Sequence, residues 1–197
     1  MDTIITIDRL LNDNKGTFRT NDAVRAGISR ITLSQLVKKG KLERVGQGQY
    51  ISPDDIPDEL YILQQRSKKI IFSHETALFL HGMAERTPLF NSLTIPSNSK
   101  LSLSISDSCK IYYVKPILHS LGQSIVMSNM GNQIIAYDIE RTICDIIRSR
   151  SRIDSQTFTS ALKNYTVRKE QNWNKLREYS ETFRITKLLQ QYLDVLI

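Results

Sequence analysis

The sequence lacks the features that mark secreted, membrane-spanning and metal-binding proteins. Its 197 residues include only two cysteines, Cys109 and Cys144, and these do not have the spacing of metal ligands. No apolar run approaches the ~18 residues that a membrane span needs. The first residues lack the basic segment and cleavage site of a signal peptide. We therefore expect a cytoplasmic protein with reduced thiols, Cys144 being buried, and with no metal, no cofactor and no membrane contact.

Sequence signatures of catalysis are also missing. The chain contains no P-loop, no GxSxG motif and no GxGxxG motif. His74 and His81 stand seven residues apart and do not form the HExxH pattern of a zinc protease. Asp138, Glu140 and Asp145 offer carboxylates for a nuclease metal cluster, but a helix cap and a first-turn acid explain the first two more simply. We expect that the protein is not an enzyme.

Positive charge is concentrated in two stretches of a chain whose net charge is +7. Residues 15–51 contain eight basic and two acidic side chains, and residues 141–187 contain eleven basic and five acidic ones. Residues 52–60, between them, contain four acids and no base. This distribution suggests two surfaces that face a polyanion. The alternative is that basic side chains only solvate helix faces, and it weighs more for the second stretch.

The acidic segment 52–58 is the clearest boundary in the chain. Its two prolines each remove a backbone donor and bias the preceding residue away from helix, while its aspartates favour turns. We therefore expect two domains, over residues 1–60 and 61–197. The fold class that we expect is α+β, with a winged helix-turn-helix followed by a mixed α/β domain that ends in helices.

The first sixty residues have the pattern of a winged helix-turn-helix. A helix over residues 4–11 is followed by a second that Thr20 can cap and Gly27 can close, and by a third that runs from a Ser29 cap to about Lys39. Residues 41–45 then alternate between polar and apolar, and residues 49–51 begin a return strand after a turn with two glycines. A hairpin directly after the third helix is the wing of this fold.

The third helix is the expected DNA reader, since one α-helix fits the major groove of B-DNA. Leu33, Leu36 and Val37 should pack against Leu11, Val24 and Ile28. The opposite face and the wing then carry polar and basic side chains, which we expect to bind DNA: Arg30, Thr32, Ser34, Gln35, Lys38, Lys39, Lys41, Arg44, Gln47 and Gln49.

Each of these side chains has a chemistry that suits one part of the duplex. Arg30 suits guanine and Gln35 suits adenine, while Thr32 or Ser34 can touch a thymine methyl group or a phosphate. The four basic residues from Lys38 to Arg44 should neutralise phosphates, and Gln47 and Gln49 of the wing should reach a minor groove or the backbone. The alternative is a small domain that binds another protein.

The second domain should place its strands early and its helices late. Ser73 can cap a helix that ends at Gly82, and Asp138 can cap the helix 139–148. We expect strands over 101–105, 110–114 and 133–137, and further helices over 155–165, 170–183 and 184–196.

A cluster of arginines from Arg148 to Arg152 is the strongest feature of this domain. It suits a phosphate-rich partner, either flanking DNA or an RNA or nucleotide. The alternative is a solvated helix end, where cations also suit the helix dipole. The basic surface that we expect here comprises Arg141, Arg148, Arg150, Arg152, Lys163, Arg168 and Lys169.

Three segments resemble a known family. They are the helix-to-wing segment Leu36–Tyr50, the segment Phe72–Gly82 with Leu93–Pro96 soon after it, and the segment Ala136–Ile147. Together they resemble the AbiE-type antitoxins of bacterial abortive-infection systems, which are type IV toxin–antitoxin modules of phage defence. Residues 97–108 and the last fifty residues depart from the family.

The resemblance implies a repressor of its own operon that binds inverted repeats in the promoter. Its second domain would counteract a nucleotidyltransferase-like toxin without a stable complex. Because no long heptad seam is present, we expect a monomer. Two alternatives from other classes are a stand-alone regulator whose second domain senses a ligand, and a DNA-cleaving enzyme that the winged helix targets.

Overall fold

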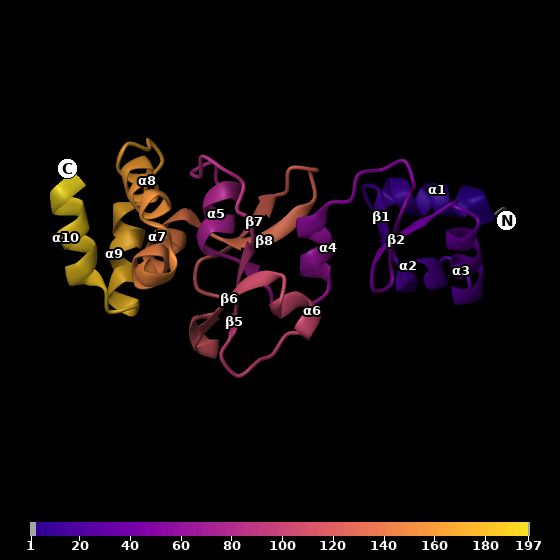
Figure 1. Ribbon diagram of the computed structural model, residues 1–197, viewed down its shortest axis with the longest axis horizontal. Coiled ribbons are helices and arrows are strands. Elements are labelled where there is room, and N and C mark those ends of the chain that lie inside the picture. The colour runs from indigo at the N-terminus through magenta and orange to yellow at the C-terminus, as the bar shows by residue number, and fades with distance from the viewer. Residues whose placement is uncertain (1–2, 197) are drawn as a thin grey trace. The chain divides into compact units, whose positions relative to one another are not determined.

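A computed structural model of the chain describes residues 3–196 and divides it into two compact units (Figure 1). Unit 1 runs to Arg66 and includes the short segment Ser128–Asn132. Unit 2 consists of Ser67–Met127 and the chain from Gln133 onward. Both helices and strands are present, so the α+β class expected from the sequence is confirmed. Within the described residues, no helix combines the length and the apolar character needed to cross a membrane.

Unit 1 packs short helices against a small antiparallel sheet. Its three strands lie in the order β1-β3-β2, and they are β1 (Thr17–Arg19), β2 (Glu43–Gly46) and β3 (Gln49–Ile51). Its helices are α1 (Thr3–Asp13), α2 (Thr20–Arg25), α3 (Arg30–Lys38) and α4 (Glu59–Gln65). Phe18, Ala23 and Leu33 are almost fully buried at the centre of its core. The helix α4 belongs to this unit, although residues from 61 onward were expected in the second domain.

The start of α2 differs from the expectation. The first turn is closed by the Asp22 carboxylate, which accepts a hydrogen bond from the backbone N–H of Arg19 at 2.9 Å. The expected cap by Thr20 is therefore wrong, because the chain enters the helix directly from β1 and the cap position falls on Arg19. The packing expected for Val24 is also wrong, since this side chain is exposed, whereas Ile28 and Leu33 are buried together. Ser29 caps α3 as expected, and it accepts from the N–H of Thr32 at 3.0 Å.

A buried carboxylate organises the boundary segment. Asp58 caps α4 through a hydrogen bond from the Tyr61 N–H at 3.0 Å. Its other oxygen accepts hydrogen bonds from the hydroxyl of Ser128 and, at 2.8 Å, from the amide of Asn132. Asp58 is only 5% exposed, so the last acid of the segment 52–58 is a structural residue of unit 1 rather than part of a solvated linker.

Unit 2 is built on a five-stranded mixed sheet with the strand order β6-β5-β4-β8-β7. The central pair β4–β8 and the pair β5–β6 are parallel, whereas the other two pairs are antiparallel. The strands are β4 (Ile71–Phe72), β5 (Asn91–Pro96), β6 (Cys109–Val114), β7 (Gln123–Met127) and β8 (Gln133–Tyr137).

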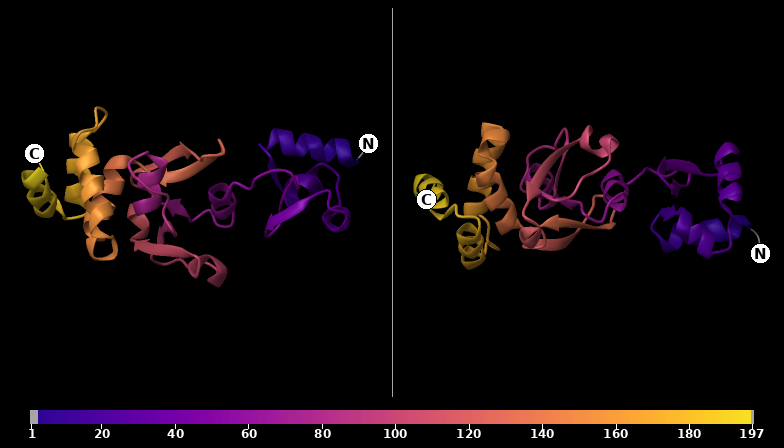
Figure 2. Two further views of the ribbon diagram at one scale, coloured as in Figure 1. Left: turned by 45° about the horizontal axis from the view of Figure 1, so that its top comes forward. Right: turned by 90° about the horizontal axis from the view of Figure 1, so that it is seen from below.

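The C-terminal helices of unit 2 gather on one side of this sheet (Figures 1 and 2). The core that they form with it includes Ile143, Cys144 and Tyr165, so the expected burial of Cys144 is confirmed. The longer helices are α5 (His74–Leu80), α7 (Ile139–Arg148), α8 (Ser155–Thr166), α9 (Trp173–Thr182) and α10 (Thr186–Leu196). The short ones are α6 (Leu103–Ser106) and the 3-10 helices η1 (Pro116–Leu118) and η2 (Arg150–Arg152).

The strand expected over residues 101–105 is wrong, because this segment contains the helix α6. Its serines explain the change: the hydroxyl of Ser106 donates to the Leu103 carbonyl at 3.0 Å, and that of Ser108 donates to the Ser104 carbonyl at 3.1 Å. Such local bonds satisfy the backbone without a neighbouring strand. The alternating pattern therefore does not mark two faces of a sheet, and Leu103 is exposed while Ile105 is buried.

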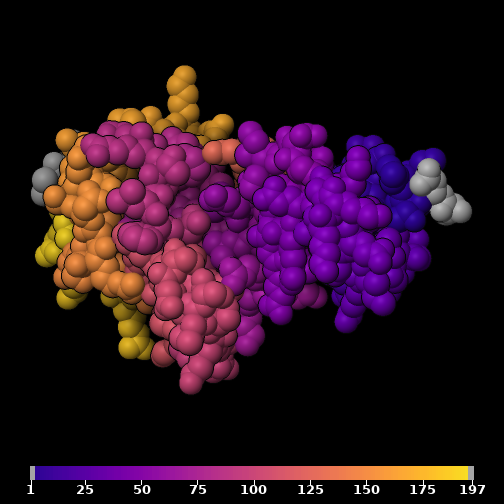
Figure 3. Space-filling view, turned by 45° about the vertical axis from the view of Figure 1, so that its right-hand side comes forward, coloured from indigo at the N-terminus to yellow at the C-terminus, as the bar shows by residue number. Residues whose placement is uncertain are grey.

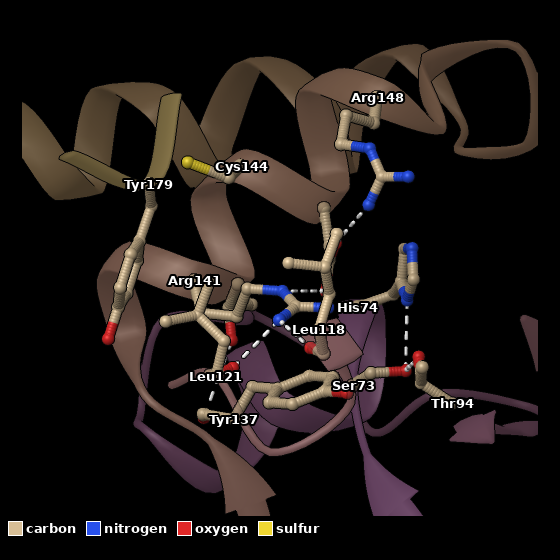
Figure 4. A network of polar contacts seen from close by, with 12 residues as sticks. Ser73, His74, Thr94, Leu118, Leu121, Tyr137, Arg141, Cys144, Arg148 and Tyr179 are labelled. Carbon is tan, nitrogen blue, oxygen red and sulfur yellow. Dashed lines mark hydrogen bonds and ion pairs between the residues drawn. The ribbon is translucent and has the colours of Figure 1, made fainter. Parts of the chain in front are cut away.

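The helix α7 matches its expected bounds, and its side chain Arg141 is fully buried. The Arg141 Nε lies 2.9 Å from the Asp145 carboxylate, and Nη1 donates to the carbonyls of Leu118 and Leu121 at 3.0 and 2.7 Å (Figure 4). The guanidinium also lies 4.0 Å from the ring centre of Tyr137. Arg141 was expected in a basic surface. That expectation is wrong, because the helix position that looks polar in sequence faces an internal acceptor set.

Removal of the Asp145 carboxylate should destabilise the protein strongly. We expect Asp145→Ala to lower the free energy of unfolding by about 3–5 kcal/mol, because it leaves the buried Arg141 charge without its partner. The matched control is Glu181→Ala, which breaks an Arg177–Glu181 pair with the same spacing on an exposed face. This control should cost only about 0.5 kcal/mol or less. Urea unfolding followed by circular dichroism measures both, and equal losses would contradict the assignment.

Candidate nucleic-acid interface

The helix α3 presents a polar and basic face to solvent. Leu33 is completely buried and Leu36 and Val37 are partly buried against the core of unit 1. The sequence-derived candidates that this leaves exposed on α3 and at its end are Arg30, Ser34, Gln35, Lys38 and Lys39. The structure therefore brings these five together on one element. Figure 3 shows one face of unit 1, in indigo and purple.

Thr32 differs from its neighbours, although it was expected among the DNA-binding residues. Its hydroxyl lies 2.8 Å from the hydroxyl of the helix cap Ser29, and the side chain is only partly exposed. This bond holds the Thr32 side chain on the first turn of α3. Its hydroxyl therefore stabilises the start of α3.

The β2–β3 hairpin adds exposed polar groups next to α3 in the sequence. Lys41, Arg44 and Gln47 are exposed, as expected. Gln49 is only 3% exposed, and its amide donates to the Ile62 carbonyl at 3.3 Å. The expectation that Gln49 reaches DNA is wrong, because β3 is the central strand of its sheet and the side chain at this position is turned toward α4.

The basic side chains of this region are electrostatically uncompensated. Residues 30–42 contain no acidic side chain. Among the residues that the structure describes, the ion pairs do not include Arg30, Lys38, Lys39, Lys41 or Arg44. Cations that are not neutralised within the protein can displace the counterions of a phosphate backbone.

One exposed side chain of α3 was not among the residues expected from the sequence to contact DNA. Ile31 is 73% exposed, although it is an isoleucine in the first turn of the helix. The signal that could have found it is its spacing, since residue 31 falls outside the stripe that Leu33, Leu36 and Val37 define.

Some of the basic residues that were expected to form a surface on the second domain contact other residues of unit 2. Arg148 donates to Asp145 at 3.1 Å, Arg152 lies 4.1 Å above the Tyr112 ring centre, and Arg168 pairs with Glu170 at 3.6 Å. The remaining candidates are Arg150, Lys163 and Lys169, which are exposed. Arg148 and Arg152 are exposed too, so the cluster 148–152 lies at the surface of unit 2 while two of its arginines contact other residues of that unit.

His74 lies at the junction of this cluster with the sheet. Its ring nitrogens lie 2.9 and 3.0 Å from the hydroxyls of Ser73 and Ser149, and its ring stacks on Tyr112 with centres 3.4 Å apart. Figure 4 shows Ser73 contacting Thr94 as well, and the Thr94 hydroxyl donates to Ser73 at 2.8 Å. The hydroxyl of Ser73 is therefore not the helix cap that the sequence suggested.

The environment of His74 favours a neutral imidazole. Burial lowers the pKa of His74 well below its ordinary value, and the nearby cations lower it further; these are Arg141, Arg148, Arg152 and Lys110. His74 also has a left-handed backbone, with φ at 48°. A non-glycine residue pays for that conformation, so the surrounding contacts must hold it in place.

Stability should fall as pH falls below neutral, because His74 has a lowered pKa in the folded state. The unfolded chain takes up the proton near pH 6.5 while the folded chain resists it, so this contribution is complete above that value and is lost below it. We expect a loss of about 1 kcal/mol between pH 7.5 and 5.5 from this group. His74→Asn, which tolerates the left-handed backbone, should show a shallower loss in urea unfolding.

Burial lowers the pKa of His119 too. The stability of the His74→Asn variant should therefore still fall with falling pH, but less steeply than that of the wild type. An NMR titration of the wild-type imidazoles gives the same answer without a substitution. A His74 resonance that titrates near pH 6.5 would contradict this prediction.

A solved structure resembles this chain in fold, and a family model resembles part of it in sequence. The crystal structure of the RV2827C protein from Mycobacterium tuberculosis matches with a TM-score of 0.65 and 13% sequence identity, covering 98% of this chain and 78% of that one. At this identity, the match shows a shared fold. No curated protein matches the chain.

A family model described as a transcriptional regulator, the AbiEi antitoxin, matches residues 6–53. These residues include most of α1, all of α2 and α3, and all three strands of the unit 1 sheet. The match therefore covers the exposed basic face of α3 and the adjacent hairpin. The resemblance to AbiE-type antitoxins is confirmed, in that residues 6–53 match the model of the AbiEi antitoxin family of transcriptional regulators.

Proposed function

We propose that unit 1 is a winged helix-turn-helix that binds double-stranded DNA, with α3 in the major groove and the β2–β3 hairpin as the wing. The observation that carries this proposal is the exposed face of α3 and its end, which carries no acid and where Arg30, Lys38 and Lys39 lie outside the ion pairs of the described residues. The family match over the same residues supports it. Since the family is one of regulators, the DNA is the promoter of the protein's own operon, and a monomer binds each half of an inverted repeat.

Within this interface, the position of a residue along α3 determines whether it contacts a base or a phosphate. Arg30 and Gln35 lie in the part of the helix that reaches base edges, where they suit guanine and adenine. Lys38 and Lys39 lie at the far end, and Lys41 and Arg44 follow on the hairpin side, where they suit phosphates. Ser34 lies on the same exposed face, and Gln47 at the wing tip reaches the backbone or the minor groove.

The second part of the proposal is the antitoxin role, which the family description supports. Unit 2 counteracts a nucleotidyltransferase-like toxin, without catalysis and without a stable complex, in an abortive-infection system of type IV in the cytoplasm. Five residues of the expected basic surface are exposed to a phosphate-rich partner: Arg148, Arg150, Arg152, Lys163 and Lys169.

One observation favours a second candidate function, a regulator that senses a ligand. Unit 2 contains a cavity of about 390 Å³, which lies within the usual size range of small-molecule sites. Leu78 and Met83 line it together with Glu75 and Lys110. If the chain is a stand-alone regulator, a small molecule bound there changes DNA affinity, and no neighbouring gene encodes a toxin that the chain counteracts.

Two substitutions on α3 test the docking of this helix. We expect Arg30→Ala to weaken operator binding by roughly 1–3 kcal/mol and to relax the base preference at one position. Lys39→Ala should weaken binding to operator and scrambled DNA about equally, and reduce the slope of log affinity against log salt by about one unit. Electrophoretic shifts at several salt concentrations measure both effects.

The matched control for these variants is Lys187→Ala, which removes an exposed lysine from a helix of unit 2. It should leave affinity and salt slope unchanged. Arg30 and Lys39 are exposed, so neither variant should lower the melting temperature noticeably. Unchanged operator affinity in both α3 variants would falsify the docking of α3 in the groove.

A rescue assay separates the two proposed roles. Cells that express the neighbouring toxin gene should grow again when the wild-type chain is co-expressed from an unrelated promoter. The Arg30→Ala chain should rescue growth equally well, because the substitution affects unit 1 only. If the wild-type chain rescues growth and the Arg30→Ala chain does not, toxin neutralisation depends on DNA binding.

A further inference from the structure

Ile31 is the one large apolar side chain on the DNA-facing part of α3. It is 73% exposed, whereas Ile28, just before the helix, is 6% exposed in the core. Residues 31, 35 and 38 are separated by four and three positions, so Ile31 shares one helix face with Gln35 and Lys38. Single exposed apolar residues are common on protein surfaces. The position of Ile31 within a polar and basic reading face is what gives it significance.

The major groove offers this side chain a single kind of apolar partner at the base edges. Guanine, cytosine and adenine present hydrogen-bonding groups there, and thymine alone adds a methyl group, at C5. An isoleucine has no donor or acceptor, so its contact with a base edge is favourable where it removes a methyl group from water. Its branched side chain is also stiff in a helix, which reduces the entropy lost in the contact.

The other candidates for this contact are less suitable. Thr32 is held by its hydroxyl contact with Ser29 at 2.8 Å and is only partly exposed. Ser34 has no methyl group. Arg30 and Gln35, which flank the position on the same exposed side, have polar ends that suit hydrogen-bonding edges.

We propose that Ile31 reads a thymine methyl group in the operator, and thereby fixes the base at one position of each half-site. This inference rests on the proposed docking of α3. It predicts an operator in which the thymine contacted by Ile31 neighbours the bases contacted by Arg30 and Gln35.

Exchange of thymine for uracil tests this inference, because it removes the methyl group and leaves base pairing unchanged. An operator is first selected from random DNA with the wild-type chain. Each thymine is then replaced in turn by uracil. The wild type should bind about three- to tenfold more weakly at one such position per half-site. Ile31→Ala should bind the thymine and uracil operators equally at that position.

The matched control is Ile56→Ala, which truncates an isoleucine of similar exposure, 76%, in the segment 52–58. This variant should keep the full uracil effect. A wild type that selects no DNA sequence would overturn the proposed function. Specific binding without any uracil effect, or a uracil effect that persists in Ile31→Ala, would overturn only the role of Ile31.

Discussion

Burial of the Arg141 guanidinium is the constraint on which unit 2 depends. A charge removed from water is costly unless its hydrogen bonds and its counter-charge are replaced inside. Here Asp145 supplies the counter-charge, the carbonyls of Leu118 and Leu121 supply acceptors, and the rings of Tyr137 and Phe183 lie 4.0 and 4.3 Å from the guanidinium carbon. The loop between β6 and β7 is therefore tied to α7. Gly122 shows how close the approach is, since a Cβ there would lie 2.6 Å from that of Arg141.

The same network ties part of a charge-rich surface segment to the interior of unit 2. Asp145 accepts from Arg148 as well as Arg141, so one carboxylate pairs with two guanidiniums and a net positive charge remains. The chain then turns at Ser149, whose hydroxyl contacts His74, and continues to Arg152 above the Tyr112 ring. A neutral His74 fits beside these cations because it adds no further positive charge. In unit 1 the cations of α3 face solvent and lie outside the ion pairs described, so no internal contact of this kind holds them.

Local signals in the sequence were sufficient for most elements and insufficient for buried polar contacts. The helix 139–148 and the strand 133–137 were predicted to the residue, because an Asp138 cap and a clear change of periodicity mark them. The short strands β4 and β5 were not predicted, since their pairing depends on partners distant in sequence. The same limit applies to Arg141 and Gln49: a polar side chain looks exposed in a sequence, and only the fold places acceptors such as the Ile62 carbonyl beside it.

Hydrogen bonds within unit 1 reduce the set of side chains that are available for the proposed contact with DNA. Gln49 serves the contact of β3 with α4, and Thr32 serves the start of α3. In the proposed docking, the part of α3 that faces the base edges presents Arg30, Ile31, Ser34 and Gln35, and the lysines lie at the end of the helix. Hydrogen bonds and apolar contact carry sequence information, whereas phosphate contacts carry affinity that salt weakens. In the proposed docking, the order of residues along α3 therefore separates the side chains for specificity from those for affinity within a helix of nine residues.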